Sequence, residues 1–197
     1  REIGQTEITT EEGIEVFQKE KYYLLKKNVN IISDNFELTA DLVKAFFEKD
    51  LYDITDIYSE VDVYLKSPRG LEASGEKIDF NAKKEDIYIE GQKSYLKTSD
   101  FEMMSDFSIK VNNSTGNFKV IGPNSKIVSV DYTILGEDIK GNFINVDGET
   151  IVQKLYVVDK NQVNIVTETL DMYSKRAEFD REKDIIELFK NVIIYRE

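Results

Sequence analysis

A chain of 197 residues with 41% hydrophobic residues is long enough to bury a sizeable core and is not a disordered sequence. Its formal net charge of −12 opposes nonspecific binding to nucleic acid and general attachment to an anionic membrane surface. Cysteine and histidine are absent, which excludes disulfides, thiol nucleophiles, the usual zinc sites and the common general base near neutral pH.

The first quarter of the chain predicts short strands, in keeping with a composition that includes eleven Phe and eleven Tyr residues. Thr6–Thr10 is a Thr-rich strand candidate. Ile14–Gln18 and Tyr22–Leu25 predict a hairpin around a charged turn. Lys26–Asn28 then predicts a turn into a strand at Val29–Ile32.

The next stretch, Phe36–Ile54, recurs along the chain. Its spacing of apolar and small residues returns at Leu71–Ile89 and Leu170–Leu188, with a shorter echo at Phe101–Val111. Such self-similarity indicates a repeated structural unit.

Within the unit, apolar or small residues alternate with polar ones, which is the period of a strand with one buried face. A three-residue step, as from Gly75 to Ile78, keeps the apolar set on one side through a corner or bulge. We therefore expect strands, corners and turns in succession, little helix, and one apolar set that faces the interior. That set comprises Phe36, Leu38, Val43, Leu71, Ile78, Phe80, Ile87, Ile89, Phe101, Met103, Met172, Phe179, Ile186 and Leu188.

Gly122–Ser125 contains one of the two prolines and is the best candidate boundary between two halves. The first half is 1–121; the second, 122–197, is either a continuation of the same array or a second partial unit. Within the second half, Ile127–Leu135 predicts one longer strand and Gly136–Gly148 an irregular segment. Strands are expected at Ile151–Val158 and Val163–Thr167.

The string Leu38-Thr39-Ala40-Asp41, after Asn28-Val29-Asn30-Ile31, resembles the OstA-like, or LptA-like, proteins of lipopolysaccharide transport. The Asn-Val element returns at Asn191-Val192, and Thr6–Gly13 is similar to the first strand and turn of that family. The resemblance covers about residues 5–121 and 165–196. It implies an all-β, twisted, V-shaped jelly roll of two facing antiparallel sheets.

The resemblance also implies a function and a location. The chain would be a non-enzymatic periplasmic carrier or bridge that shields lipopolysaccharide acyl chains in an apolar groove. Its partners would be lipopolysaccharide and other transport proteins of the inner and outer membranes, with no cofactor and no nucleic acid. The expected groove residues are Phe36, Leu38, Val43, Leu71, Ile78, Phe80, Phe101, Met103, Met172 and Phe179.

An array that does not close into a barrel leaves a free strand edge at each end. We expect Ile8 and Thr10 to mark one edge, and Val192 and Ile194 the other, so that copies pair head to tail.

Two other interpretations of the whole chain stay open at this point. One is a membrane-anchored LptC-like component, and another is a self-assembling β-repeat scaffold with a solid core and no lipid. Acidic clusters such as Glu85-Asp86 could bind calcium, and basic clusters such as Lys83-Lys84 could meet lipid phosphates, although each is typical of a solvated turn. No catalytic residues and no metal site are expected.

Overall fold

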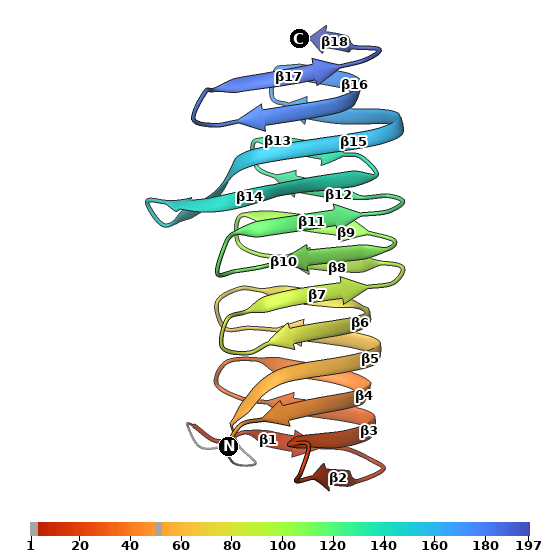
Figure 1. Cartoon of the computed structure of the whole chain (residues 1–197), viewed down its shortest axis with the longest axis vertical. Helices are drawn as coiled ribbons and strands as arrows, with labels where there is room; N and C mark the ends of the chain where they lie inside the picture. Colours follow the sequence, from red (N-terminus) through yellow and green to blue (C-terminus); the bar gives the residue numbers. More distant parts are fainter. Residues whose placement is uncertain (1–3, 50–52) are drawn as a thin grey trace.

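The computed structural model describes residues 4–49 and 53–197, so residues 50–52 of the repeated stretch lie outside the described part. The described residues form eighteen strands and no helix, which confirms the predicted all-β class (Figure 1). In this part of the chain there is accordingly no helix that could cross a membrane.

The strands follow one another with short connections throughout. They are β1 Glu7–Thr9, β2 Ile14–Phe17, β3 Tyr22–Ile32, β4 Glu37–Phe47, β5 Ile54–Lys66, β6 Glu72–Asn81, β7 Asp86–Glu90, β8 Ser94–Lys97, β9 Phe101–Ser105, β10 Ser108–Val111, β11 Asn117–Ile121, β12 Lys126–Ser129, β13 Tyr132–Leu135, β14 Asp138–Val146, β15 Glu149–Thr167, β16 Leu170–Asp180, β17 Ile185–Phe189 and β18 Ile193–Arg196.

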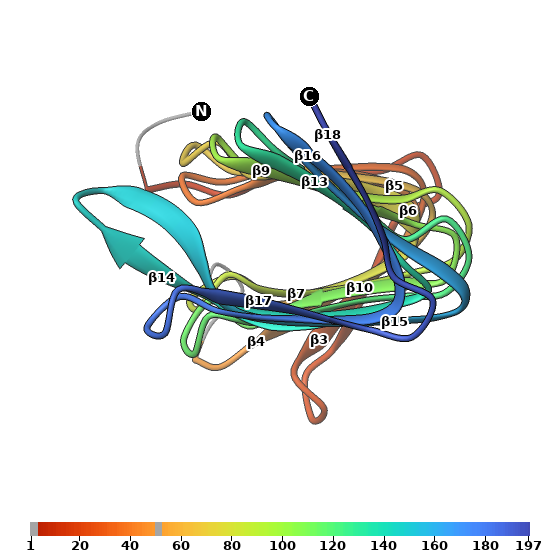
Figure 2. The ribbon, with the colours of Figure 1, turned by 90° about the horizontal axis from the view of Figure 1, so that it is seen from above.

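The strands form two facing layers that are joined along one side and open along the other (Figure 2). Six long strands, β3 to β6, β15 and β16, bend at a corner and contribute to both layers. The first layer runs in the order β1, β3, β4, β5, β6, β8, β9, β12, β13, β15, β16, β18. The second runs in the order β2, β3, β4, β5, β6, β7, β10, β11, β14, β15, β16, β17. This is the predicted twisted jelly roll of two facing antiparallel sheets.

The corners explain the three-residue step in the sequence. In β3 the corner is Lys27–Asn28, where both residues have positive φ and together stand opposite Asp41 of β4. Asn28 donates its backbone N–H to Asp41 Oδ1 at 3.2 Å. Two residues opposite one define a β-bulge, which bends the strand and keeps the apolar set facing inward.

Small residues stand next to the corners because neighbouring chains approach closely there. A Cβ on Gly75 would lie 2.6 Å from Ile89 Cγ2. Ser105 and Ser174 occupy equivalent positions, are buried, and donate their hydroxyls to backbone carbonyls. Close packing at the corners therefore explains why each three-residue step begins at a small residue.

Three inward rows of side chains run across successive strands from one end of the array to the other. The row of the first layer consists of Ile8, Ile31, Leu38, Leu65, Ala73, Leu96, Met103, Ile127, Ile134, Ile165, Met172 and Ile194. The second layer contributes the row Val16, Tyr23, Ala45, Ile57, Phe80, Ile87, Val111, Phe118, Gly141, Leu155, Phe179 and Ile186. Its other row is Ile14, Leu25, Val43, Ser59, Ile78, Ile89, Ile109, Val120, Ile139, Val157, Ala177 and Leu188. These rows form one continuous apolar core.

Two sequence-based expectations for the second half are wrong. Ile127–Leu135 is two strands, β12 and β13, because the chain reverses at Val130–Asp131 without interrupting the alternation of apolar residues. The segment expected to be irregular contains strand β14, whose inward position 141 is a glycine. The Phe118 ring fills the space beside Gly141, so the missing apolar side chain is replaced by a neighbour.

The boundary expected at Gly122–Ser125 is a corner turn between β11 and β12. Strands on either side of it pair with each other, β9 with β12 and β11 with β14. Whether the halves are separate units stays a prediction.

Candidate functional site

The expected groove residues lie between the two layers, and most of them are in a closed part of the core. Phe36, Leu38, Val43, Ile78, Phe80, Met103 and Met172 are all buried. The rings of Phe36 and Phe80 meet edge to face at 5.9 Å, which joins the layers across the interior. In this region the side chains of the facing sheets fill the space between them.

A cavity of about 350 Å³ opens on the side where the layers are not joined. Leu71 and Phe101, two of the expected groove residues, line it together with Ile87 and Leu96. Polar turn residues, including Asn112 and Thr115, form its rim. The cavity thus has an apolar floor and a hydrogen-bonding edge, and we call it the side cavity.

The hairpin between β14 and β15 projects beside the open side (Figure 2) and contacts the first layer. Phe143 of β14 stacks on Phe101 with ring centroids 4.3 Å apart. Thr150 donates its backbone N–H to Asp100 Oδ2 at 3.0 Å. Because Asp100 belongs to the β8–β9 turn, the hairpin ties the two layers together next to the side cavity.

A second, smaller cavity of about 100 Å³ lies near the C-terminal end. Ile134, Ile165 and Phe179 line it, and burial raises the pKa of the Tyr132 hydroxyl in its wall. Arg181 lies at this cavity, donates its Nε–H to Val152 O at 2.6 Å, and has its guanidinium carbon 5.4 Å from the Phe179 ring centroid. The site combines an almost wholly apolar wall with one cation.

The inward rows become exposed where the array ends. Ile186, expected in the interior, belongs to an inward row but is 44% exposed, because β17 is the last strand of the second layer among the described residues. Ile194 in β18 is 52% exposed for the same reason. At the other end, Ile14 and Val16 of β2 are exposed, whereas Ile8 is partly buried.

The expected edge residues lie at the two opposite ends of the first layer. Ile8 is in β1, and Thr10 follows it and donates its hydroxyl to Lys26 O at 2.5 Å. Val192 precedes β18, and Ile194 lies within it. Figure 1 shows the N-terminal and C-terminal strands at opposite ends of the long axis.

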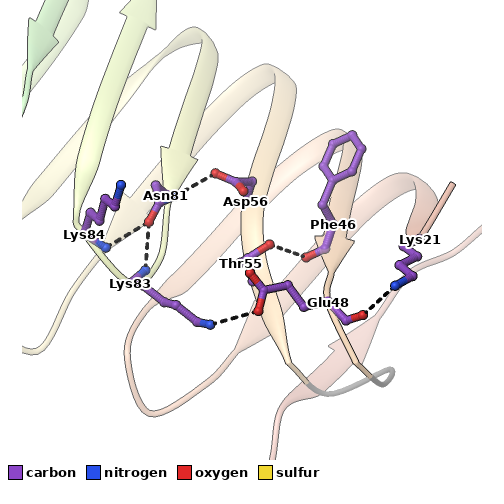
Figure 3. A network of polar contacts seen from close by, with 8 residues as sticks. All are labelled: Lys21, Phe46, Glu48, Thr55, Asp56, Asn81, Lys83 and Lys84. Carbon is purple, nitrogen blue, oxygen red and sulfur yellow. Dashed lines mark hydrogen bonds and ion pairs between the residues drawn. The ribbon is translucent and has the colours of Figure 1, made fainter.

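A polar network covers turns of the second layer near the N-terminal end (Figure 3). Asn81 Oδ1 accepts the backbone N–H groups of Lys83 and Lys84 at 3.1 and 2.8 Å. Lys83 Nζ lies 3.3 Å from Glu48 Oε2, so this lysine of the predicted basic cluster is engaged in an ion pair. The acidic clusters considered for calcium do not form a site of this kind: the described residues contain no group of three or more acidic side chains placed to hold a metal ion.

Sequence reasoning missed Phe143, Ile134 and Ile165, which complete the walls of the two cavities. It also missed a signal for turns on the open side of the first layer. Each of those turns begins with a Ser or Thr whose hydroxyl oxygen accepts a backbone N–H two or three residues later. These residues are Ser33, Ser67, Thr98, Ser129 and Thr167. The signal locates the β12–β13 reversal at Ser129 that alternation alone conceals.

No protein-family model matches the sequence, and no curated protein matches it. Among solved structures, the chain is similar to LptH from Pseudomonas aeruginosa, described as the LptA-homologous periplasmic component of the lipopolysaccharide transport device. The two share 12% sequence identity with a TM-score of 0.43, over 83% of this chain and 94% of that one.

Proposed function

We propose that this chain is a non-enzymatic periplasmic carrier that shields lipopolysaccharide acyl chains between its two layers. The observation that carries the proposal is the continuity of the inward rows. They remain almost entirely apolar from the first strand to the last, and their end members are exposed. Exposed apolar side chains at both ends of a row are not needed to stabilise the core, and exposed apolar surface of this kind is typical of a binding or interaction site.

The free volume bears on how an acyl chain would be held. The C-terminal cavity of about 100 Å³ corresponds to about three water molecules at roughly 30 Å³ each. Occupancy of this cavity, or of the closed core around Phe36 and Phe80, by an acyl chain therefore requires the layers to separate, and the open side is where they can do so without breaking strand pairs. On this proposal the contacts of the β14–β15 hairpin with Phe101 and Asp100 are released when lipid enters.

Photo-crosslinking tests the carrier function directly. The proposed lipid contacts are Phe36, Leu38, Val43, Leu71, Ile78, Phe80, Phe101, Met103, Met172 and Phe179. Crosslinkers at Phe36 and Met103 should label lipopolysaccharide, whereas one at Glu72, in an outward row of the first layer, should not. Equal labelling at the three positions, or none, would count against an acyl-chain site between the layers.

Head-to-tail assembly is part of the same proposal. Each layer contains twelve strand segments within the described residues, and all neighbours are antiparallel. With an even number, a translated copy can add β1 to β18 and β2 to β17 and preserve the antiparallel alternation in both layers. The exposed members Ile194 and Ile186 would then be covered, and the inward rows would continue into the next copy.

Sedimentation of an Ile194→Pro variant tests the assembly. Proline removes a backbone donor from β18, so concentration-dependent oligomers should disappear while circular dichroism retains the β signature. Oligomers that survive the substitution, or a wild-type chain that stays monomeric at high concentration, would refute end-to-end pairing.

The closed packing around Phe36 and Phe80 favours a second candidate, a self-assembling scaffold with a solid core and no lipid. The two candidates share the assembly but differ in labelling. A scaffold gives oligomers by sedimentation and no lipid adduct at Phe36 or Met103.

A further inference from the structure

The outward face of the second layer carries three lysines side by side on neighbouring strands. Lys110 of β10 is opposite Lys119 of β11, and Lys119 is opposite Lys140 of β14. We call these three residues the lysine row. Neighbouring strands are about 4.8 Å apart, so the three side chains start within about 10 Å of one another. In Figure 1 these strands follow one another at mid-height of the array.

On the outward face of the first layer, residues that stand opposite each other on neighbouring strands alternate in charge. An outward row of the first layer reads Glu37, Lys66, Glu72, Lys97 and Glu102 across successive strands. Opposite charges that face each other across strands stabilise a sheet, and like charges destabilise it. The lysine row therefore departs from the pattern that this chain uses on its other outward face.

Few anions of the chain compensate the lysine row. Lys140 Nζ lies 3.4 Å from Asp138 Oδ2 on its own strand. Within the described residues, Lys110 and Lys119 form no ion pair, although the chain has 38 acidic residues against 26 basic ones. Acidic residues are abundant in the sequence but absent from the positions directly opposite these two lysines.

The surroundings limit the size of a ligand. On the neighbouring strands, Tyr88 stands opposite Lys110 and Tyr156 stands opposite Lys140. One strand further along on each side, the same row continues with Asp79 and Glu178. These carboxylates would repel a wide anionic surface, so an anion that spans only the lysines fits best. A hollow of about 340 Å³ adjoins the row at Lys140, but its lining includes the carboxylates Glu178, Asp180 and Glu187. A polyanion therefore fits better on the lysines themselves than in this hollow.

We propose that the lysine row binds a compact ligand with several closely spaced phosphate groups. Ammonium groups bind phosphate oxygens through charge-assisted hydrogen bonds, and a ligand with more than one phosphate can engage neighbouring lysines together. Binding also removes the repulsion that the register imposes, so part of the affinity comes from relief of like-charge contact. This site lies on the opposite side of the sheet from the proposed acyl-chain interior and does not depend on it.

Calorimetric titration with inorganic tripolyphosphate at low ionic strength tests the proposal. The wild-type chain should bind it, and Lys119→Gln should weaken binding about five- to tenfold, as expected for loss of one exposed charge-assisted contact. The matched control is Lys97→Gln, an equally exposed mid-strand lysine that stands between Glu72 and Glu102. It should leave the affinity unchanged.

Thermal unfolding without ligand supplies a second measurement that distinguishes the two lysines. Lys119→Gln relieves like-charge repulsion and should raise Tm by about 1–2 °C, whereas Lys97→Gln removes the cation that stands between Glu72 and Glu102 and should lower it by a similar amount. No binding by the wild-type chain, or equal loss of affinity in both variants, would overturn the site. Binding to vesicles with anionic phospholipid but not to tripolyphosphate would overturn the compact ligand in favour of a membrane surface.

Discussion

Identical substitutions at two members of one inward row should have very different effects on stability. Ile127 is 0% exposed in the middle of the row, whereas Ile194 is 52% exposed at its end. Ile→Ala removes three carbons, each worth about 0.8 kcal/mol when buried, and a cavity penalty adds to this in a closed core. We expect Ile127→Ala to lower the free energy of unfolding by about 3 kcal/mol and Ile194→Ala by about 1 kcal/mol or less.

Urea unfolding followed by circular dichroism, at a protein concentration where the chain is monomeric, measures both effects. For a chain of this size, about 3 kcal/mol corresponds to a fall in Tm of roughly 6–12 °C. Ile194→Ala should instead weaken self-association. Equal destabilisation by the two substitutions would mean that Ile194 is covered within the monomer, and the argument from exposed row ends would fail.

Three further outcomes follow from particular contacts. Gly141→Ala should destabilise by about 1–3 kcal/mol in urea unfolding, because a Cβ would lie 2.7 Å from Phe118 Cζ and close to the Lys154 carbonyl; an unchanged midpoint would contradict the close approach. The hydrogen bond to Glu60 raises the pKa of Tyr58 to about 12, so its contribution to stability is complete below pH 10 and is lost as pH rises through 12; ultraviolet titration should show a tyrosine that titrates near pH 12 and that Glu60→Gln shifts toward the ordinary range. Asp100→Asn should increase hydrogen exchange at the Thr150 amide, since a neutral oxygen accepts its N–H less strongly than a carboxylate; unaltered protection would show that the stacking of Phe143 on Phe101 holds the hairpin alone.

The fold was predictable from the sequence where apolar alternation and the three-residue step coincide. Phe80 and Ile87, for example, face inward on adjacent strands, as their alternation predicts. The step from Gly75 to Ile78 marks a corner, where Glu76 stands opposite both Val61 and Asp62 of β5 in a β-bulge. These signals depend on local backbone geometry, which the sequence specifies directly.

The cavities were less predictable because they depend on which distant strands face each other. Phe101 and Phe143 stack across the open side although they belong to different layers, and neither shares a strand pair with the other. The exposure of Ile186 likewise reflects the position of β17 as the last described strand of the second layer, which alternation within β17 cannot reveal. Alternation identifies the side of the sheet on which a residue lies but not what covers it.

The register that closes the interior also fixes the outward lysines. Phe118 faces inward and Lys119 outward on β11, so a shift by one residue would bury the ammonium and expose the ring. Burial of an unpaired charge costs far more than repulsion between exposed lysines. A one-residue shift of the strand register therefore cannot remove the repulsion among Lys110, Lys119 and Lys140. Only a substitution or a bound anion can relieve it. An exposed position accepts many residues at little cost to the fold, so the lysines there are better explained by a bound anion than by the needs of the core.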